Sequence, residues 1–215
     1  MGGGEVLYYL SNSGIKAIGL ESDIAEYNYV TSLGLDVRKK FIDTENEDTD
    51  ITKLLKSVDV VSFFNVLEHI ELPRKYIDYI SANMKSGAFM VLEVPKHPSL
   101  GSFANLTSLD NIYRHIVPPI HLQVFSENSL RLLLEKDFDI IATWEFGQGF
   151  TDIINNAMIL SGLEQSTIYD TILRAQTDIQ RAVDIAGLSD QIMIVARKKE
   201  VVMSGMPQNK QDKWY

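Results

Sequence analysis

The chain has 215 residues, of which 29 are acidic and 20 basic, so its formal net charge is −9, and it contains no cysteine. The acidic balance argues against a broad phosphate-binding face for DNA or RNA, and the lack of cysteine excludes disulfides and thiolate metal sites. No apolar run approaches the roughly 20 residues of a membrane span, and no signal-peptide pattern opens the chain. We therefore expect a cytoplasmic globular protein without nucleic-acid or membrane partners.

The N-terminal segment has the pattern of half a nucleotide-binding motif. Gly2, Gly3 and Gly4 run into a short helix signal, and an apolar stretch over residues 15–21 then predicts a buried strand that ends at Glu21. Glycines let the backbone approach a ligand closely, a helix N-terminus offers free N–H donors, and an acid at a strand tip can accept both hydroxyls of a ribose. The strand that normally precedes such glycines is missing from the sequence, and its loss is expected to expose two strand edges.

Strand and helix signals alternate along most of the chain, which predicts an α/β sheet with crossover helices. Strands are expected at residues 15–21, 36–42, 58–64, 88–95, 138–146 and 191–196, and helices at residues 23–33, 51–57, 73–84 and 126–136. The near-continuous apolar run at 58–64 predicts a central parallel strand buried on both faces. Ser126 and Ser129 open the last of these helices without a full capping box.

Three segments depart from this alternation. The acidic residues 43–48 indicate a solvated loop, residues 96–121 form a loop long enough to cover a small pocket, and residues 151–187 predict a helical insertion of two helices. The insertion carries an apolar stripe at helical spacing, made of Ile168, Ile172, Ile179 and Val183. This stripe indicates ordinary packing or a lid, with a homodimer interface as the alternative. The folded domain is expected to span residues 1–198, followed by a polar tail at 199–215.

Two further motifs point to a family. The hexapeptide Asn65-Val66-Leu67-Glu68-His69-Ile70 follows the strand at 58–64, and the segment Pro118–Ser126 places His121 shortly before a Phe125-Ser126 helix start. Together with the glycine segment, in this order and spacing, they resemble the class I S-adenosylmethionine-dependent methyltransferases, and within them the small-molecule and sugar subgroup. The resemblance covers about residues 2–150 and 190–198. It implies a Rossmann-like doubly wound sheet in the order 3-2-1-4-5-7-6 with its last strand antiparallel, here with the helical insertion before that strand.

The resemblance also implies which residues bind S-adenosylmethionine. The glycines would pass under its methionine moiety, Glu21 would accept the ribose hydroxyls with Ser22 beside it, and Asp43, at the end of the third strand of the family's sheet, would approach the adenine. Asn65 would contact the cofactor from the carboxyl end of the strand at 58–64. The alternatives are a flexible N-terminal glycine segment and, for Glu21, a solvent-exposed strand end.

Histidine suits the removal of a proton from a methyl acceptor near neutral pH. His121 follows the family's pattern after the fifth strand and is the candidate base, unless it merely packs in its loop. His69 is more readily a structural or substrate-lining residue than a base, and His97 and His115 lie on the loop expected to line the acceptor pocket. We expect no metal site, because adjacent residues on a turn, such as Glu68 and His69, rarely bind one ion.

These observations predict an enzyme that transfers a methyl group from S-adenosylmethionine to a small hydroxylated acceptor, such as a sugar or a natural-product intermediate. The enzyme would align the acceptor oxygen, the methyl group and the sulfur for in-line displacement. The alternative is a non-catalytic binding or scaffold module that keeps the fold but lacks a working cofactor loop.

Overall fold

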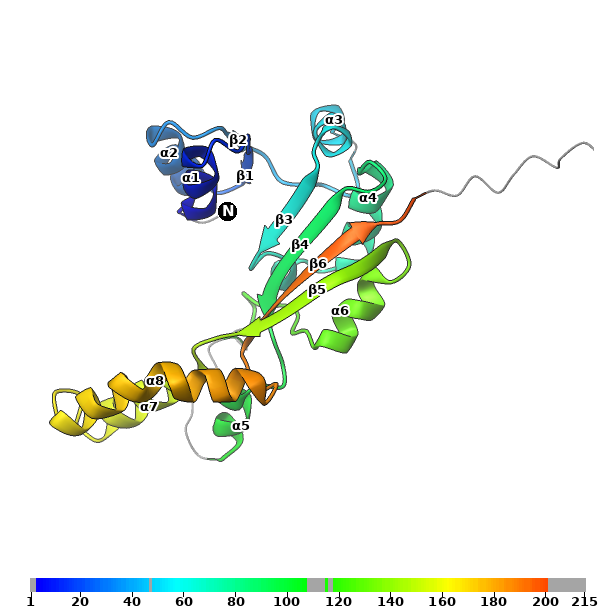
Figure 1. The fold of residues 1–215 in the computed structure, drawn as a ribbon. Helices are drawn as coiled ribbons and strands as arrows, with labels where there is room; N and C mark the ends of the chain where they lie inside the picture. The colour runs from blue at the N-terminus through cyan, green and yellow to red at the C-terminus, as the bar shows by residue number, and fades with distance from the viewer. Residues whose placement is uncertain (1–2, 47, 108–114, 116–117, 201–215) are drawn as a thin grey trace, which may run out of the picture.

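A computed structural model of the chain describes residues 3–46, 48–107, 115 and 118–200, and these residues form two sheets (Figure 1). A parallel two-stranded sheet pairs β1 (Gly19–Glu21) with β2 (Val37–Lys39). A four-stranded sheet has the order β3-β4-β6-β5, and its strands are β3 (Val60–Phe64), β4 (Phe89–Pro95), β5 (Phe138–Phe146) and β6 (Gln191–Lys198). β3 runs parallel to β4, and β6 runs antiparallel to both of its neighbours.

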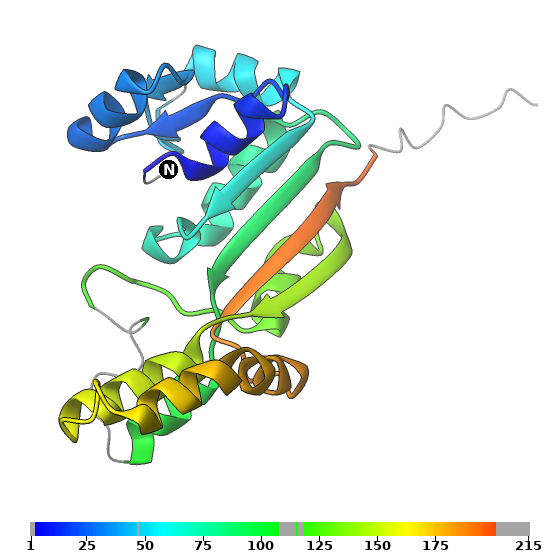
Figure 2. The same cartoon turned by 60° about the vertical axis from the view of Figure 1, so that its left-hand side comes forward.

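This arrangement confirms the predicted fold class. If the six strands are taken as the second to seventh of the expected sheet, the predicted order without its first strand gives a 3-2 pair and a 4-5-7-6 group, as observed. In the part of the chain that the structure describes, no hydrogen-bonded strand joins β1 to β3. Figure 2 shows the two sheets as neighbouring units, with the N-terminal unit beside the β3 edge of the larger sheet.

The helices follow the predicted segments closely. Their bounds are α1 (Glu5–Asn12), α2 (Ile24–Ser32), α3 (Thr49–Ser57), η1 (Leu67–His69), α4 (Pro73–Asn83), α5 (Leu100–Thr107), α6 (Glu127–Leu134), α7 (Gly149–Leu160) and α8 (Thr167–Ile185). Asp23 caps α2 by accepting hydrogen bonds from the backbone N–H groups of Ala25 and Glu26, at 2.8 and 3.0 Å. Pro73 opens α4, where its missing N–H costs no helical hydrogen bond.

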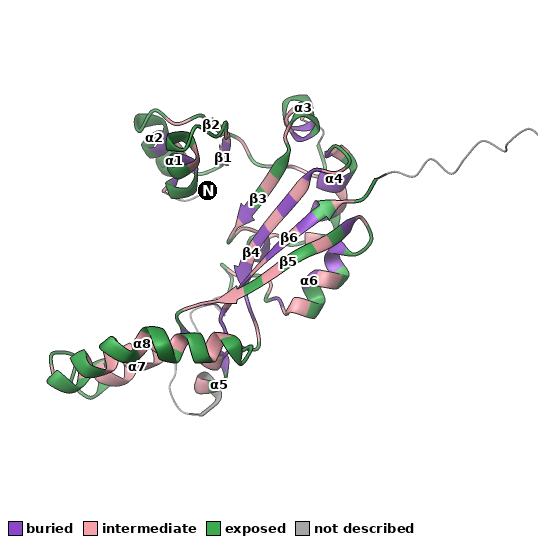
Figure 3. Cartoon of the chain, in the orientation of Figure 1, coloured by how far each residue is buried: buried purple, intermediate pink, exposed green. Residues whose placement is uncertain are grey.

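The core lies between the four-stranded sheet and the helices α4 and α6, which cover one of its faces in Figures 1 and 2. Burial alternates along the central strands, so that Met90, Leu92 and Val94 of β4 and Ile192 and Ile194 of β6 are buried while their neighbours are partly exposed. This period of two is what a sheet with one covered face requires. Figure 3 shows the contrast with the α7–α8 pair, in which α7 is mainly half-buried and α8 is largely exposed.

The prediction that the strand at 58–64 is central and buried on both faces is wrong. β3 is an edge strand of the four-stranded sheet in the described residues, Val60 is 51% exposed, and Ser62 is exposed as well. The apolar run marks a strand suited to neighbours on both sides, but only β4 pairs with it. The strands expected at 15–21 and 36–42 are also shorter than predicted, because only their three-residue paired stretches form a ladder.

Two smaller expectations need correction. The loop expected at 96–121 contains α5, whose start is fixed by a buried reciprocal pair of hydrogen bonds between Ser99 and Ser102. The helix expected at 126–136 does have a reciprocal capping box, because Ser126 accepts from the Ser129 backbone N–H at 3.1 Å and the Ser129 hydroxyl accepts from the Ser126 N–H at 2.9 Å. Serine can therefore replace the usual Glu or Gln at the third helical position.

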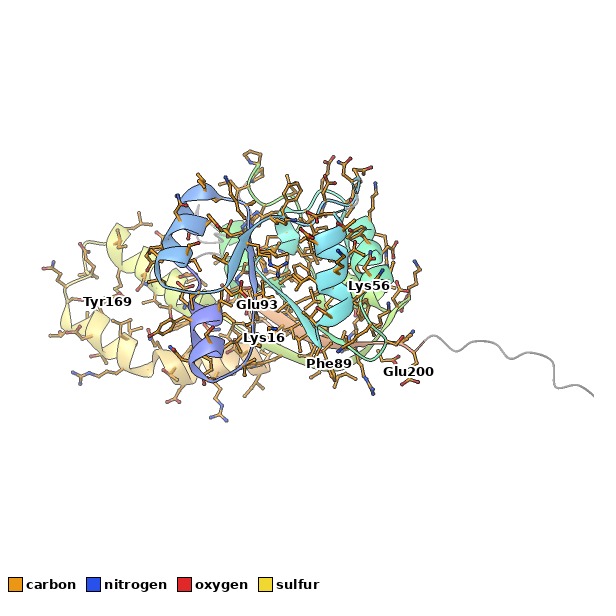
Figure 4. All side chains as sticks on the ribbon, turned by 90° about the horizontal axis from the view of Figure 1, so that it is seen from above. Lys16, Lys56, Phe89, Glu93, Tyr169 and Glu200 are labelled. Carbon is orange, nitrogen blue, oxygen red and sulfur yellow. The ribbon has the colours of Figure 1, made fainter. Side chains whose placement is uncertain are left out.

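The insertion between β5 and β6 consists of two helices, as predicted. Its apolar stripe is only partly covered, since Ile168 and Ile179 are exposed and Ile172 and Val183 half-buried. In Figure 4, Tyr169 of α8 lies far from Glu93 of β4, so the outer end of the pair extends away from the sheet. No helix within the described residues is long and apolar enough to span a membrane. The tail predicted at 199–215 lies outside the described residues from position 201 onward.

Candidate active site

The candidate active site lies where β3 ends and the chain turns into η1. Asn65, the first residue after β3, has a left-handed backbone with φ 51°. Its N–H donates to the Glu93 carbonyl at 2.9 Å and its Nδ2 donates to Glu93 Oε1 at 3.1 Å. Asparagine tolerates this conformation better than most residues. The turn therefore sends the following residues across the carboxyl ends of β3 and β4, where open α/β sheets bind ligands.

Two histidines from distant segments meet at this turn. The rings of His69 and His121 pack edge to face, with their centroids 4.8 Å apart. Nδ1 of His69 lies 2.8 Å from the carbonyl oxygen of Ile120, and Nδ1 of His121 lies 2.9 Å from that of His115. A carbonyl oxygen only accepts hydrogen bonds, so Nδ1 is the protonated nitrogen in both rings. In the neutral rings, both Nε2 atoms therefore carry a free lone pair.

Backbone hydrogen bonds hold the two histidine segments together. The carbonyl oxygen of Glu68 accepts from the N–H groups of Leu122 and Gln123, at 2.9 and 3.1 Å. His115, whose carbonyl orients His121, is itself buried, with its Nε2 3.3 Å from Oδ2 of Asp190 at the start of β6. The histidine pair is thus fixed to η1 on one side and to the end of the sheet on the other.

The Glu68 side chain is the most unusual group in this cluster. It is fully buried, and neither carboxylate oxygen has a hydrogen-bond partner among the described residues. Burial raises the pKa of the Glu68 carboxyl, while the backbone N–H of the same residue and then the imidazoles of His69, His121 and His115 act in the opposite direction. One oxygen of Glu68 and one ring nitrogen from each of His69 and His121 lie within 4.8 Å of one another.

The predicted cofactor residues Gly3 and Gly4 lead into α1. Gly4 is the N-cap of α1 with φ 82°, and a Cβ atom there would lie 3.0 Å from a methyl carbon of Val30. Glycine is therefore required both by the backbone angle and by the close approach. No side chain caps α1, so a ligand can accept hydrogen bonds from its first turn. Gly2 lies outside the described residues.

Glu21 stands at the carboxyl end of β1, as predicted, but it is buried rather than solvent-exposed. Its Oε1 accepts a hydrogen bond from the backbone N–H of Asp23 at 2.8 Å. Burial raises the pKa of the carboxyl, while the backbone N–H groups of Asp23 and Ser22 act in the opposite direction. Glu21 thus stands at the strand end with one oxygen bound to a backbone N–H and the exposed Ser22 beside it.

Asp43 does not end the strand that precedes it, as was expected. β2 stops at Lys39, and Asp43 lies in the following loop. Its carboxylate accepts from the backbone N–H groups of Glu45 and Asn46, at 2.8 and 3.2 Å, and from Nδ2 of Asn46 at 2.9 Å. These bonds lower the pKa of the Asp43 carboxyl, and the bond from the Asn46 side chain contributes most. A local aspartate turn has replaced the end of the strand.

A separate hollow lies along the outer face of α1 and α2, with a volume of about 660 Å³. Its lining residues are mainly apolar and aromatic: Gly3, Glu5, Val6, Tyr8, Tyr9, Tyr29 and Leu33. It shares only Gly3 with the predicted cofactor residues and contains no histidine, so it carries none of the chemistry of the β3 turn.

The comparison with known families decides the class of protein. The sequence profile described as "Methyltransferase domain" matches residues 1–142. The chain belongs to this methyltransferase family. The predicted class, an S-adenosylmethionine-dependent methyltransferase, is thereby confirmed, whereas the sugar subgroup stays a prediction. No curated protein matches the sequence.

Solved structures share the methyltransferase fold with this chain at low sequence identity. A SAM-dependent methyltransferase from Archaeoglobus fulgidus is 19% identical with a TM-score of 0.59, covering 92% of this chain and 82% of the other. The mycolic acid cyclopropane synthase CmaA1, crystallised with SAH, is 14% identical with a TM-score of 0.57, covering 92% and 75%. The plantazolicin methyltransferase BamL, also crystallised with SAH, is 13% identical with a TM-score of 0.57, covering 93% and 74%. These likenesses establish the fold of the methyltransferase.

Sequence reasoning missed the side chain of Glu68 and the role of Asp190. The sequence identified Glu68 only as the neighbour of His69, because it does not show that the segment with His121 folds back onto the same turn. Asp190 directly precedes β6, where its Oδ2 lies 3.3 Å from Nε2 of His115 and its Oδ1 accepts from the Gln148 N–H at 2.9 Å. The sequence signal that could have indicated Asp190 is its position as an acidic residue just before the last predicted strand.

Proposed function

We propose that this methyltransferase moves the methyl group of S-adenosylmethionine to a hydroxyl of a small metabolite, such as a sugar or a natural-product intermediate. The observation that carries the proposal is the pair His69 and His121, whose Nε2 atoms are left basic by backbone carbonyls on Nδ1. Such a pair suits proton removal from an acceptor hydroxyl at neutral pH.

The residues of the N-terminal unit fit S-adenosylmethionine. An uncapped helix start follows a glycine that permits close approach, and a buried carboxylate ends the adjoining strand. Gly3 and Gly4 would pass the methionine moiety, Glu21 would accept the ribose hydroxyls with Ser22 beside it, and Asn65 would contact the cofactor from the end of β3. When bound, the cofactor supplies an electrophilic methyl group on its sulfonium. Asp43 stays a weaker candidate for adenine, because its oxygens already serve its own turn.

A small acceptor is favoured over a nucleic acid by the charge of the chain. A net charge of −9 repels a phosphate backbone, and the histidine turn contributes Glu68 rather than lysine or arginine. In the metal-free protein His121 would be the base, with Nε2 accepting the proton of the acceptor hydroxyl as the methyl group transfers. His69 would line the acceptor, together with His97 and His115 on the loop. The homodimer and the cytoplasmic location remain predictions.

Two measurements test this function. Calorimetric titration with S-adenosylhomocysteine should show binding, and a screen of nucleotide sugars and hydroxylated metabolites should show which acceptor yields S-adenosylhomocysteine as product. With that acceptor, His121→Ala should lower turnover about 100- to 10,000-fold, as expected for loss of a general base, and leave cofactor affinity nearly unchanged.

A His121→Ala protein that melts normally and keeps full turnover would remove His121 as the base, and the same exchange at His69 would then test the other ring. A protein that binds neither S-adenosylhomocysteine nor S-adenosylmethionine would instead support the non-catalytic scaffold alternative.

A further inference from the structure

We propose that Glu68, His69 and His121 form a binding site for one divalent transition-metal ion at the β3 turn. The proposal starts from the buried carboxylate of Glu68, which has no hydrogen-bond partner for either oxygen among the described residues. An isolated buried carboxylate is costly, and proteins normally hydrogen-bond it, pair it or use it to coordinate a metal. The ring nitrogen Nε2 of His69 lies 4.0 Å from Glu68 Oε1, which is beyond hydrogen-bond range.

The three donor atoms are close enough to share an ion. They lie within 4.8 Å of one another. Nitrogen and oxygen donors sit about 2.0–2.2 Å from a zinc ion, so in a tetrahedral site two of them lie about 3.3–3.6 Å apart. The observed spread of up to 4.8 Å therefore closes with side-chain movements of about 1 Å, which the exposed ring of His69 permits.

The second argument is the orientation of both rings. A histidine that binds a metal usually donates its other ring N–H to a carboxylate or a backbone carbonyl, which fixes the tautomer and the ring plane. His69 and His121 both have this arrangement, with Nδ1 on the carbonyl oxygens of Ile120 and His115. The carbonyl of Glu68 also binds the N–H groups of Leu122 and Gln123, so the two ligand-bearing segments are held in register before any ion arrives.

The donor set selects the type of ion. Two imidazoles and one carboxylate suit zinc, iron(II), cobalt or nickel, whereas magnesium and calcium prefer oxygen donors. Three protein ligands also leave at least one coordination position open, as in catalytic zinc sites. The proposal departs from the expectation of no metal site, which considered Glu68 and His69 without His121.

A catalytic role for the ion depends on the proposed methyl transfer. The binding of the ion does not depend on it. The open position would face the same turn as the acceptor, and a hydroxyl bound to a divalent ion has a lowered pKa. With an ion present, the Nε2 atoms of both histidines are occupied. The ion would then activate the acceptor hydroxyl in place of His121, and the hydroxyl proton would leave to solvent water as the methyl group transfers.

The test measures metal binding by the whole protein after treatment with a chelator and dialysis. We expect zinc and cobalt(II), each added alone, to bind at about one ion per chain, to raise the melting temperature, and, for cobalt, to give a visible absorption band. Magnesium added alone should bind far more weakly. Glu68→Gln, His69→Asn and His121→Asn should each weaken zinc binding about 100-fold or more. The asparagine variants retain an amide N–H near the position of Nδ1.

Glu71→Gln is the matched control, because it makes the same carboxylate-to-amide exchange at an exposed residue of the same turn and should keep the zinc affinity. The proposal is overturned if the protein binds neither zinc nor cobalt, or if the three ligand variants bind zinc as the control does. Titration of the same samples with S-adenosylhomocysteine keeps the two ideas apart. Cofactor binding without metal binding removes the metal site alone, and metal binding without cofactor binding removes the proposed function alone.

Discussion

The N-terminal unit buries far fewer apolar side chains than the four-stranded sheet does. In the unit formed by α1, β1, α2 and β2, the buried apolar side chains are Leu7 and Val30, and neither belongs to the main core. The strands of that unit are three residues long. The larger sheet has strands of five to nine residues, and its buried side chains join those of α3, α4 and α6 in one continuous core.

The predicted cofactor residues and the histidine turn lie on opposite sides of this contrast in packing. The predicted cofactor residues Gly3, Gly4 and Glu21 stand on the thinly packed unit, while Glu68, His69 and His121 stand at the end of the well-packed sheet. A ligand that binds only the folded form stabilises it in proportion to its affinity and concentration. The cofactor is therefore expected to stabilise the N-terminal unit, whereas backbone hydrogen bonds already hold the turn that carries His69 and His121.

The largest expected effect comes from the core of the larger sheet. Ile80 of α4 is fully buried, and Ile80→Ala should lower the free energy of unfolding by about 2–5 kcal/mol, through lost apolar burial and the cavity left behind. Leu7→Ala removes a similar volume from the N-terminal unit and should shift the urea midpoint less. Circular dichroism during urea unfolding measures both. Equal shifts would show that the two regions are packed as one.

The second prediction concerns the cofactor half. Glu21→Ala should weaken binding of S-adenosylhomocysteine by about 1–3 kcal/mol, because two ribose hydroxyls lose a charged acceptor. Calorimetry measures the change, and Glu26→Ala, which removes an exposed carboxylate from the first turn of α2, is the control. An unchanged affinity in the Glu21 variant would refute the assignment of this residue to the ribose.

The sequence predicted the elements well where local signals and packing agree. Asp23 and Pro73 opened helices as expected, and residues 138–146 form β5 with the predicted bounds. It failed at β3, because an apolar run indicates that a strand can be buried but not whether neighbours pair with it on both sides. It also failed at Asp43, where hydrogen bonds within the loop, invisible in a hydropathy pattern, end the strand early.

The site was predictable residue by residue but not as a cluster. Asn65, His69 and His121 were all identified from motifs, and the structure brings the two histidines into contact. The third member, Glu68, could not be recognised, since its burial and its missing hydrogen bonds depend on how residues 120–123 fold back over η1. Long-range contacts of this kind are set by tertiary packing, which sequence periodicity does not record.

The smallest effect at neutral pH is expected at Tyr76 of α4, inside the better packed region. Its ring packs edge to face on Phe63 at 5.7 Å, and burial raises the pKa of its hydroxyl to about 12. An unfolded tyrosine titrates near pH 10. Between pH 10 and 12 the unfolded chain therefore loses the Tyr76 hydroxyl proton while the folded chain keeps it. The free energy of unfolding is thus unaffected by this group below pH 10 and falls as the pH rises from 10 to 12.

Tyr76→Phe lacks this ionisation. Its free energy of unfolding should equal that of the parent protein at pH 8. Between pH 10 and pH 12 its free energy of unfolding should rise above that of the parent by about 1.4 kcal/mol for each pH unit. Urea unfolding at a series of alkaline pH values measures the difference, with Tyr8→Phe, at a tyrosine that is 54% exposed, as the control for removing one hydroxyl. A constant difference between Tyr76→Phe and the parent from pH 8 to 12 would mean that water reaches this ring, and that the core beneath α4 is as loosely packed as the N-terminal unit.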